Sequence, residues 1–199
     1  MYMPKHQRQL GVGVRVPGRT RGSRDCGPRS WSMGVDARSK GRRRPTVVWL
    51  RKRGGVEGPQ STSIDDAKRA VHGLRVRGRS PMRYWRTRDV ANVRRWVRKG
   101  RPAHLAIDYG KWNDLLGDRT GDPRFRGGHS VMVYGQRRER GLLEWLLWDP
   151  LEDGRRAGIP VGPTWYPRWQ IISAARALGA RYGRSDIWAG LIGGAHGRR

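Results

Sequence analysis

With 199 residues, the chain has the length of one domain and can bury a sizeable core. No apolar run reaches about 18 residues, so no membrane span is expected, and residues 1–8 lack the features of a secretory signal. Because Cys26 is the only cysteine, an internal disulfide and a zinc site made from several cysteines of one chain are excluded. We expect neither a metal nor another cofactor.

The chain is strongly basic. Its formal net charge is +27, from 43 basic and 16 acidic residues, and arginine outnumbers lysine by 37 to 6. Arginine binds phosphate and carboxylate groups through paired hydrogen bonds and stacks on aromatic rings. This composition favours contact with nucleic acid or acidic protein surfaces through the arginine clusters at 42–44 and 137–140. The alternative is that both clusters are solvated faces without a ligand.

The first 24 residues differ from the rest. Residues 1–24 are rich in glycine and arginine and lack lasting periodicity, which predicts an extended basic arm with at most a short strand at 12–16. From Cys26 onward, apolar residues recur at helical spacing, and Pro28 suits a first helical turn. Gly34 inside this predicted helix is explained if another backbone packs closely there.

The next stretch predicts mainly short helices. Residues 46–50 are apolar and predict a short strand or the start of a buried loop. Ser63 and Asp66 have the spacing of a capping box, which predicts a short helix after them. Residues 75–82 are expected to form a loop, after which Thr87 is expected to cap another helix.

The second half is richer in predicted strands. Residues 103–109 are apolar and long enough for one buried strand, and 111–128 are expected to be a long connection. The apolar runs 130–134 and 142–148 flank a polar segment, which predicts a hairpin.

Helices followed by strands predict an α+β domain. We expect this domain to cover residues 25–182, closing with a helix that starts near Trp169 and ends at Gly179. Residues 1–24 would be the basic arm, and residues 183–199 a tail rich in glycine and arginine.

Three residues carry the chemistry of a thiolate nucleophile, its base and the residue that orients the base. Cys26 is predicted at a helix N-terminus, where backbone N–H groups and the helix dipole lower a thiol pKa. His129 starts a predicted strand after two glycines, and Asp149 ends the hairpin partner. Antiparallel pairing would bring these two side chains together, so that Asp149 fixes the imidazole tautomer.

Other polar residues have alternative interpretations. Asp108 is a second candidate for orienting His129. His104 is expected to be a packed or surface histidine rather than a metal ligand. Asp25 is expected to cap the helix or to pair with an arginine.

The motifs resemble the papain-like cysteine peptidases, and within them the bacteriocin-leader-processing type and its phage-encoded relatives. They cover about residues 25–178 in the family's order: Asp-Cys-Gly-x-x-Ser at 25–30, Gly-Arg-Pro at 100–102, Gly-His-Ser-Val-x-Val-x-Gly at 128–135 and Trp-Asp-Pro at 148–150. The resemblance implies a papain-like α+β fold with an N-terminal helix carrying the cysteine and a following antiparallel sheet. It makes Cys26 the nucleophile, His129 the base and Asp149 the orienting residue.

The family also has an oxyanion-hole glutamine a few residues before the cysteine. Residues 18–24 contain none, and Gln9 and Gln7 would serve only if the chain between them and Cys26 looped out.

The resemblance implies hydrolysis of peptide or amide bonds through a thioester, with a peptidoglycan stem peptide, a leader peptide or a virion protein as substrate. One alternative is a weak or inactive structural virion (tail) protein that keeps the fold and docks on acidic protein or DNA. Another is plain nucleic-acid binding. The sequence leaves the localisation open, a virion being one setting.

Overall fold

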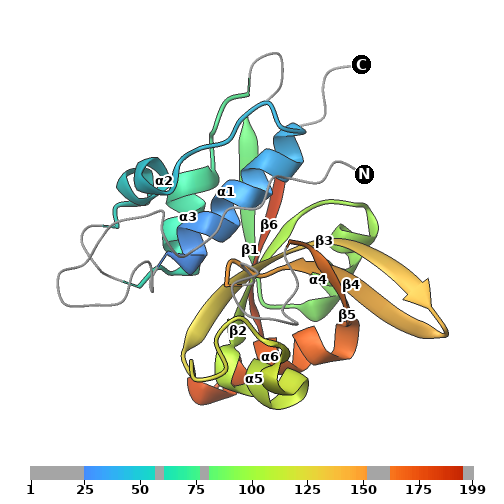
Figure 1. Ribbon diagram of the computed structural model, residues 1–199. Coiled ribbons are helices and arrows are strands. Elements are labelled where there is room, and N and C mark those ends of the chain that lie inside the picture. Colours follow the sequence, from blue (N-terminus) through green and yellow to red (C-terminus); the bar gives the residue numbers. More distant parts are fainter. Residues whose placement is uncertain (1–24, 57–60, 77–80, 152–161, 195–199) are drawn as a thin grey trace.

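The computed structural model describes residues 25–56, 61–76, 81–151 and 162–194. They form a mixed fold around one antiparallel sheet with strand order β1-β6-β2-β3-β4-β5 (Figure 1). In chain order the strands are β1 (Met82–Thr87), β2 (Ala103–Asp108), β3 (Gly128–Glu139), β4 (Leu142–Trp148), β5 (Thr164–Pro167) and β6 (Trp188–Gly194). The expected combination of helices with an antiparallel sheet is therefore confirmed.

Helices cover both faces of this sheet. Figure 1 shows α1, α2 and α3 grouped on one side of the molecule and α5 and α6 on the other. The helices are α1 (Cys26–Ser39), α2 (Val47–Gly54), α3 (Ile64–Val71), α4 (Val90–Arg98), α5 (Tyr109–Leu116) and α6 (Arg168–Arg181), with a 3-10 turn η1 (Gly117–Arg119). Within the described ranges, none of them is both long and apolar enough to cross a membrane.

Two hydrophobic cores follow from the alternation of side chains along the strands. On β3, Val131 and Val133 pack into the core under α4, α5 and α6, whereas Met132 and Tyr134 pack into the core under α1, α2 and α3. This separation is what a strand buried on both faces requires, because successive side chains point in opposite directions. β3 is thus the strand on which both halves of the fold are built.

The helix that begins at Cys26 packs tightly on the sheet. At Gly34, a Cβ would crowd the side-chain ends of Ile192 and Met132. The expected neighbour of Gly34 was another backbone, but the atoms closest to it are side-chain ends, which the missing Cβ lets reach α1 from β6 and β3.

The first sequence prediction that fails is the strand or loop at residues 46–50. These residues begin helix α2, and the Thr46 hydroxyl accepts a hydrogen bond from the Trp49 backbone N–H as an N-cap. Val47 and Leu50 are buried three residues apart, which is helical spacing. A five-residue apolar run is too short to distinguish the 3.6-residue period of a helix from the two-residue period of a strand. The N-cap at Thr46 favours the helix.

Three further elements were not anticipated. Strand β1 begins at Met82, where a loop was expected to end, and Asp89 rather than Thr87 caps α4 by accepting a hydrogen bond from the Ala91 N–H. Helix α5 begins at Tyr109 and takes up the start of the connection predicted at 111–128, and β5 precedes the final helix. In contrast, the capping box of Ser63 and Asp66 is present at α3, as predicted.

The predicted C-terminal tail also needs correction. Residues 188–194 form β6 between β1 and β2, so the sheet reaches well beyond residue 182. Helix α6 continues through Gly179 to Arg181. The basic arm at 1–24 and its short strand lie outside the described residues.

Gly179 gives a test of how α6 meets the segment that leads into β6. Alanine normally favours a helix over glycine by about 1 kcal/mol, but a Cβ at Gly179 would overlap the backbone carbonyl of Asp186. We therefore expect Gly179→Ala to lower the free energy of unfolding by roughly 1–3 kcal/mol in urea denaturation. Ser173→Ala on the same helix is the control and should change stability by less than about 0.5 kcal/mol. A stabilised Gly179→Ala variant would contradict this packing.

Candidate active site

Helix α1 presents Cys26 at its first residue. The carboxylate of the preceding Asp25 pairs with Arg51 of α2 at 3.1 Å, and both side chains are buried. Asp25 makes no side-chain cap, so of its two expected roles the arginine pair is the one observed. On the other side, the Thr62 side chain fills the space where Gly27 would carry a Cβ. Contacts from two neighbouring segments therefore fix the start of α1.

His129 and Asp149 meet across the β3–β4 hairpin. Met132 pairs with Trp148 in the register of the two strands, which places the start of β3 beside the residue that follows β4. His129 Nε2 and Asp149 Oδ1 lie 2.6 Å apart, and both side chains are almost fully buried. The backbone N–H of Leu151 donates to the same carboxylate oxygen at 2.8 Å. The hairpin thus produces the contact that the sequence predicts.

Two aromatic rings hold the imidazole in place. Tyr109 lies edge-on to His129 with ring centroids 4.7 Å apart, and Phe125 does so at 6.2 Å. Gly127 gives Phe125 room, since a Cβ there would overlap its ring. The glycine pair before His129 therefore serves packing as well as ligand access. No sequence motif marked Tyr109 or Phe125, because their place beside His129 depends on the loop between α5 and β3.

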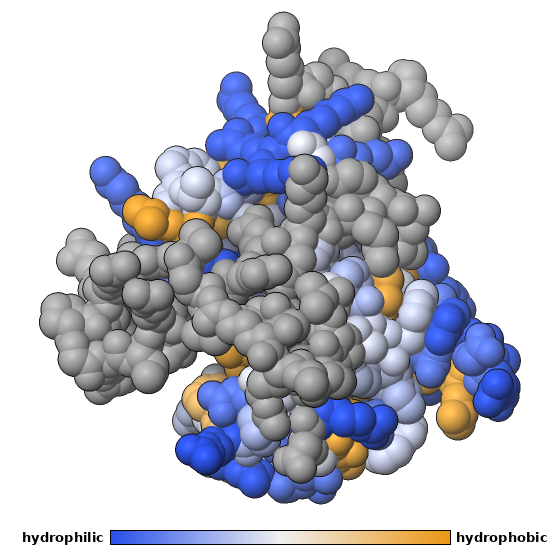
Figure 2. All heavy atoms as spheres, viewed as in Figure 1, coloured by the Kyte–Doolittle hydropathy of each residue, from blue (hydrophilic) through white to orange (hydrophobic). Residues whose placement is uncertain are grey.

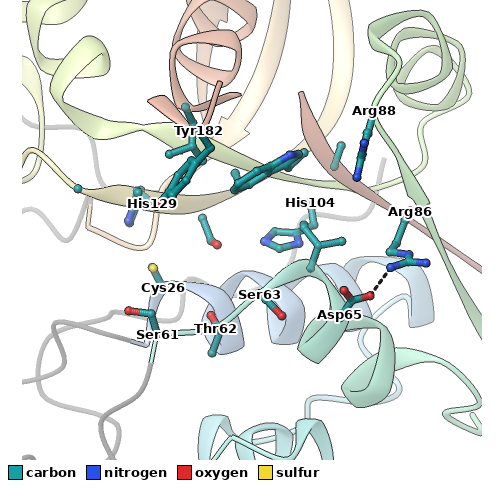
Figure 3. Close-up of a pocket in the computed structure, with 18 of the residues that line it drawn as sticks. Cys26, Ser61, Thr62, Ser63, Asp65, Arg86, Arg88, His104, His129 and Tyr182 are labelled. Carbon is teal, nitrogen blue, oxygen red and sulfur yellow. Dashed lines mark hydrogen bonds and ion pairs between the residues drawn. The ribbon is translucent and has the colours of Figure 1, made fainter. Parts of the chain in front are cut away.

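Cys26 and His129 approach each other from opposite sides of the site. Figure 3 shows the Cys26 sulfur at the end of α1 below the strand that carries His129. His129 Nδ1 is the ring nitrogen that does not face Asp149, and it is buried. The sulfur and this nitrogen are therefore placed to exchange a proton.

The local field favours a thiolate. Burial alone would raise the pKa of the Cys26 thiol, but the hydrogen bond and positive charge of His129 and the backbone N–H groups of Ser130 and Gly27 hold that pKa below its ordinary value. Burial likewise opposes a charge on His129. The Asp149 carboxylate and the Cys26 sulfur outweigh it and raise the pKa of His129. Both shifts favour the thiolate–imidazolium form of the pair over the neutral form.

The sulfur opens into a cavity of about 950 Å³. Besides Cys26 and His129, residues from the segment before α3 and from strands β1 and β2 line it, among them Thr62, Arg86 and His104 (Figure 3). Trp188 of β6 lines it as well. A cavity of this size accommodates side chains of a peptide.

The remaining candidates lie in other roles. Asp108 pairs with Arg181 at 2.7 Å and accepts a hydrogen bond from the Lys111 N–H at the start of α5. The carboxylate that contacts His129 is therefore that of Asp149 and not that of Asp108. His104 was expected to be either packed in the core or on the surface, and it is packed. Gln7 and Gln9 lie outside the described residues, so their expected oxyanion role stays a prediction. In the described ranges, His, Cys, Asp and Glu side chains form no group of three that could hold a metal.

The two arginine clusters lie on the outside of the fold. Figure 2 shows hydrophilic residues over the far end of the β3–β4 hairpin, where residues 137–140 lie. Arg137 pairs with Glu144 at 2.7 Å and stacks on Trp165, and Arg44 pairs with Asp36 at 2.9 Å. Part of this positive charge is therefore engaged within the fold, and binding of a polyanion stays a prediction.

Comparison with known proteins places the fold with a peptidase domain. One similar solved structure is the peptidase domain of Streptococcus ComA, a bi-functional ABC transporter involved in a quorum-sensing pathway. The two align with a TM-score of 0.53 and 13% sequence identity, over 94% of this chain and 99% of the ComA domain. No protein-family model matches the chain, and no curated protein does. At this identity the likeness establishes the fold.

The environment of Cys26 predicts a reactive thiol. The pH midpoint for alkylation by iodoacetamide should lie below the ordinary thiol pKa of 9.0, and His129→Ala should move it upward because burial then acts with less opposition. Since the chain has one cysteine, every alkylation event reports this site. The exposed His72, changed to alanine, is the control and should leave the midpoint in place. If His129→Ala left the pH midpoint of alkylation unchanged, the contact between the Cys26 sulfur and His129 would be contradicted.

Proposed function

We propose that the protein is a papain-like cysteine peptidase or amidase. The observation that carries this proposal is the meeting of Cys26, His129 and Asp149 at a cavity large enough for a peptide. The likeness of the fold to a peptidase domain supports it. The composition of the site matches nucleophilic catalysis, in which an activated thiolate works beside a base that a third residue orients.

The reaction follows from the positions of the atoms. The Cys26 thiolate attacks the carbonyl carbon of a peptide bond, and the carbonyl oxygen takes the negative charge. His129 gives the proton on Nδ1 to the leaving amine as the C–N bond breaks, which leaves a thioester on sulfur. A water molecule then loses a proton to His129 and attacks the thioester, so that the acid is released, the C–S bond breaks and the thiolate–imidazolium pair is restored.

The charge on the carbonyl oxygen requires hydrogen-bond donors. The first turn of a helix leaves its N–H groups without intrahelical partners, so we assign the Cys26 backbone N–H to the oxyanion. The positive end of the α1 dipole adds to its effect. A second donor from Gln9 or Gln7, as the family resemblance implies, stays a prediction.

The site supports a peptide as substrate without selecting a particular peptide. The cavity and the thiolate support a peptide substrate, and peptidoglycan stem peptides, leader peptides and virion proteins remain the predicted choices. No described residue bears on a phage or virion setting, which also stays a prediction. The alternative of an inactive structural protein requires an unreactive Cys26, and the alkylation profile above decides between the two.

Hydrolysis should depend on the thiol. We expect Cys26→Ser to reduce cleavage of a quenched fluorescent peptide library by at least about 1000-fold, because a hydroxyl is not ionised by His129 at neutral pH. Mass spectrometry of a slow substrate should show an acyl adduct on Cys26 in the wild type. Ser173→Ala, remote from the cavity, is the control. Full cleavage by Cys26→Ser would remove Cys26 from the mechanism.

Asp149 should set the alkaline limit of activity. Its carboxylate raises the pKa of His129, and the imidazolium must protonate the leaving amine, so activity falls as pH rises through that pKa. Asp149→Asn removes the charge and should move the alkaline limb of the kcat/KM profile to lower pH. The Leu151 N–H would keep the amide oxygen toward His129, so the maximum should drop by less than about tenfold.

Asp149→Ala provides the comparison. It removes both the charge and the orienting oxygen, so we expect the same shift of the alkaline limb together with a loss at the maximum of about 10- to 100-fold. An alkaline limb that stays in place in both variants would show that Asp149 does not control the charge on His129.

A further inference from the structure

A second histidine lines the same cavity. His104 of β2 is only 1% exposed, and its ring lies between Cys26 and Arg86 in Figure 3. The proposed reaction does not use it. Its role therefore has to be read from its hydrogen bonds and its surroundings.

Tyr84 fixes the tautomer of this ring. The Tyr84 hydroxyl lies 2.9 Å from His104 Nδ1, and burial, with the charge of Asp65, raises the pKa of Tyr84 well above 10.0, so the hydroxyl keeps its proton. If the hydroxyl donates to Nδ1, the ring proton sits on Nε2. The reverse arrangement would leave both the hydroxyl proton and the Nε2 lone pair unmatched, and is therefore disfavoured.

The Nε2–H group has no hydrogen-bond partner among the described residues. Burial, together with the charge of the nearby His129, lowers the pKa of His104 to about 3, so the ring is neutral at physiological pH. The ring that carries this buried neutral donor is one of the residues that line the cavity. An unmatched buried donor is costly, and an acceptor that enters the cavity relieves that cost.

The two arginines that line the cavity near this donor already form ion pairs with carboxylates of the protein. Arg86 forms an ion pair with Asp65 at 2.5 Å, and Arg88 forms one with Asp186 at 3.5 Å. A carboxylate entering beside His104 would lose its hydration without gaining a protonated imidazole. A neutral carbonyl oxygen meets a neutral N–H donor at lower cost.

We propose that this cavity is a specificity pocket in which His104 Nε2–H donates to the carbonyl oxygen of a substrate carboxamide side chain, that of glutamine or asparagine. The proposal rests on the proposed peptidase function and names the substrate class of that site. His104 is a specificity-determining residue and takes no part in bond cleavage. Gly190 supports the arrangement, because a Cβ there would overlap the Tyr84 hydroxyl.

The test is a quenched fluorescent peptide library in which each position in turn carries Gln, Glu or Leu. At one position, wild-type kcat/KM should favour Gln over both Glu and Leu by at least about tenfold. His104→Phe combined with Tyr84→Phe replaces both hydrogen-bonding groups without leaving a buried orphan hydroxyl, and should abolish that preference. His104→Gln, which keeps an N–H donor, should retain part of it.

The control is Trp169→Phe, which introduces the same residue at an exposed position of α6 outside the cavity and should keep the wild-type preference. Iodoacetamide alkylation of Cys26 should proceed at the wild-type rate in the double variant, since the Cys26–His129 pair is untouched. Equal cleavage of the Gln and Leu peptides at every position, or a preference that survives in the double variant, would overturn the proposal.

A binding experiment separates this proposal from the proposed peptidase function. In the Cys26→Ala protein with ¹⁵N-labelled histidine, N-acetyl-glutamine amide should shift the His104 Nε2 resonance, and N-acetyl-leucine amide should not. If no peptide is hydrolysed but this shift occurs, the carboxamide pocket is supported and the peptidase function fails. If peptides are hydrolysed in a Cys26-dependent way but neither the shift nor the preference is seen, only the pocket assignment fails.

Discussion

The docking of α1 across the start of β3 is the constraint on which the site depends. The Ser30 hydroxyl donates a buried hydrogen bond of 2.9 Å to the carbonyl of Ser130. The backbone N–H of Ser130 faces the Cys26 sulfur and helps to keep the pKa of this thiol low. One residue of β3 therefore fixes the first turn of the helix and stabilises the charge at its end. If β3 slid by one residue, the donor to the sulfur and the position of His129 would change together.

Buried ion pairs favour one arrangement of the elements around Cys26. Asp25 with Arg51 and His129 with Asp149 are both buried pairs, one on each side of Cys26. Removing one partner of such a pair typically costs about 3–5 kcal/mol, because the remaining charge loses its compensation. The pairs therefore penalise any arrangement in which α1, α2 and the hairpin are not all in place. The stability of the fold and the geometry of the site depend on the same contacts.

The sequence predicted the parts of the site that rest on local rules. The hairpin signal between residues 130 and 148 was enough to bring His129 to Asp149, and Cys26 lies at a helix N-terminus as its neighbours indicated. Elements decided by distant partners were missed. Strand β6 is rich in glycine and looked like a tail, yet it is buried because Tyr84 and other β1 residues pack over it. Helix α5 was missed because its N-cap, Asp108, is also the last residue of strand β2.

The two histidines of the cavity show how environment divides one residue type between two tasks. His129 contacts a carboxylate and a thiolate, which favour its charged form, whereas His104 is buried against a tyrosine hydroxyl, which does not. The two rings also repel each other when both are charged, so a proton on His129 helps to keep His104 neutral. The charge needed for the proposed cleavage therefore comes from the contacts of His129 with Asp149 and Cys26, whereas the neutrality needed for the proposed recognition of a carboxamide comes first from the burial of His104 and then from the charge on His129.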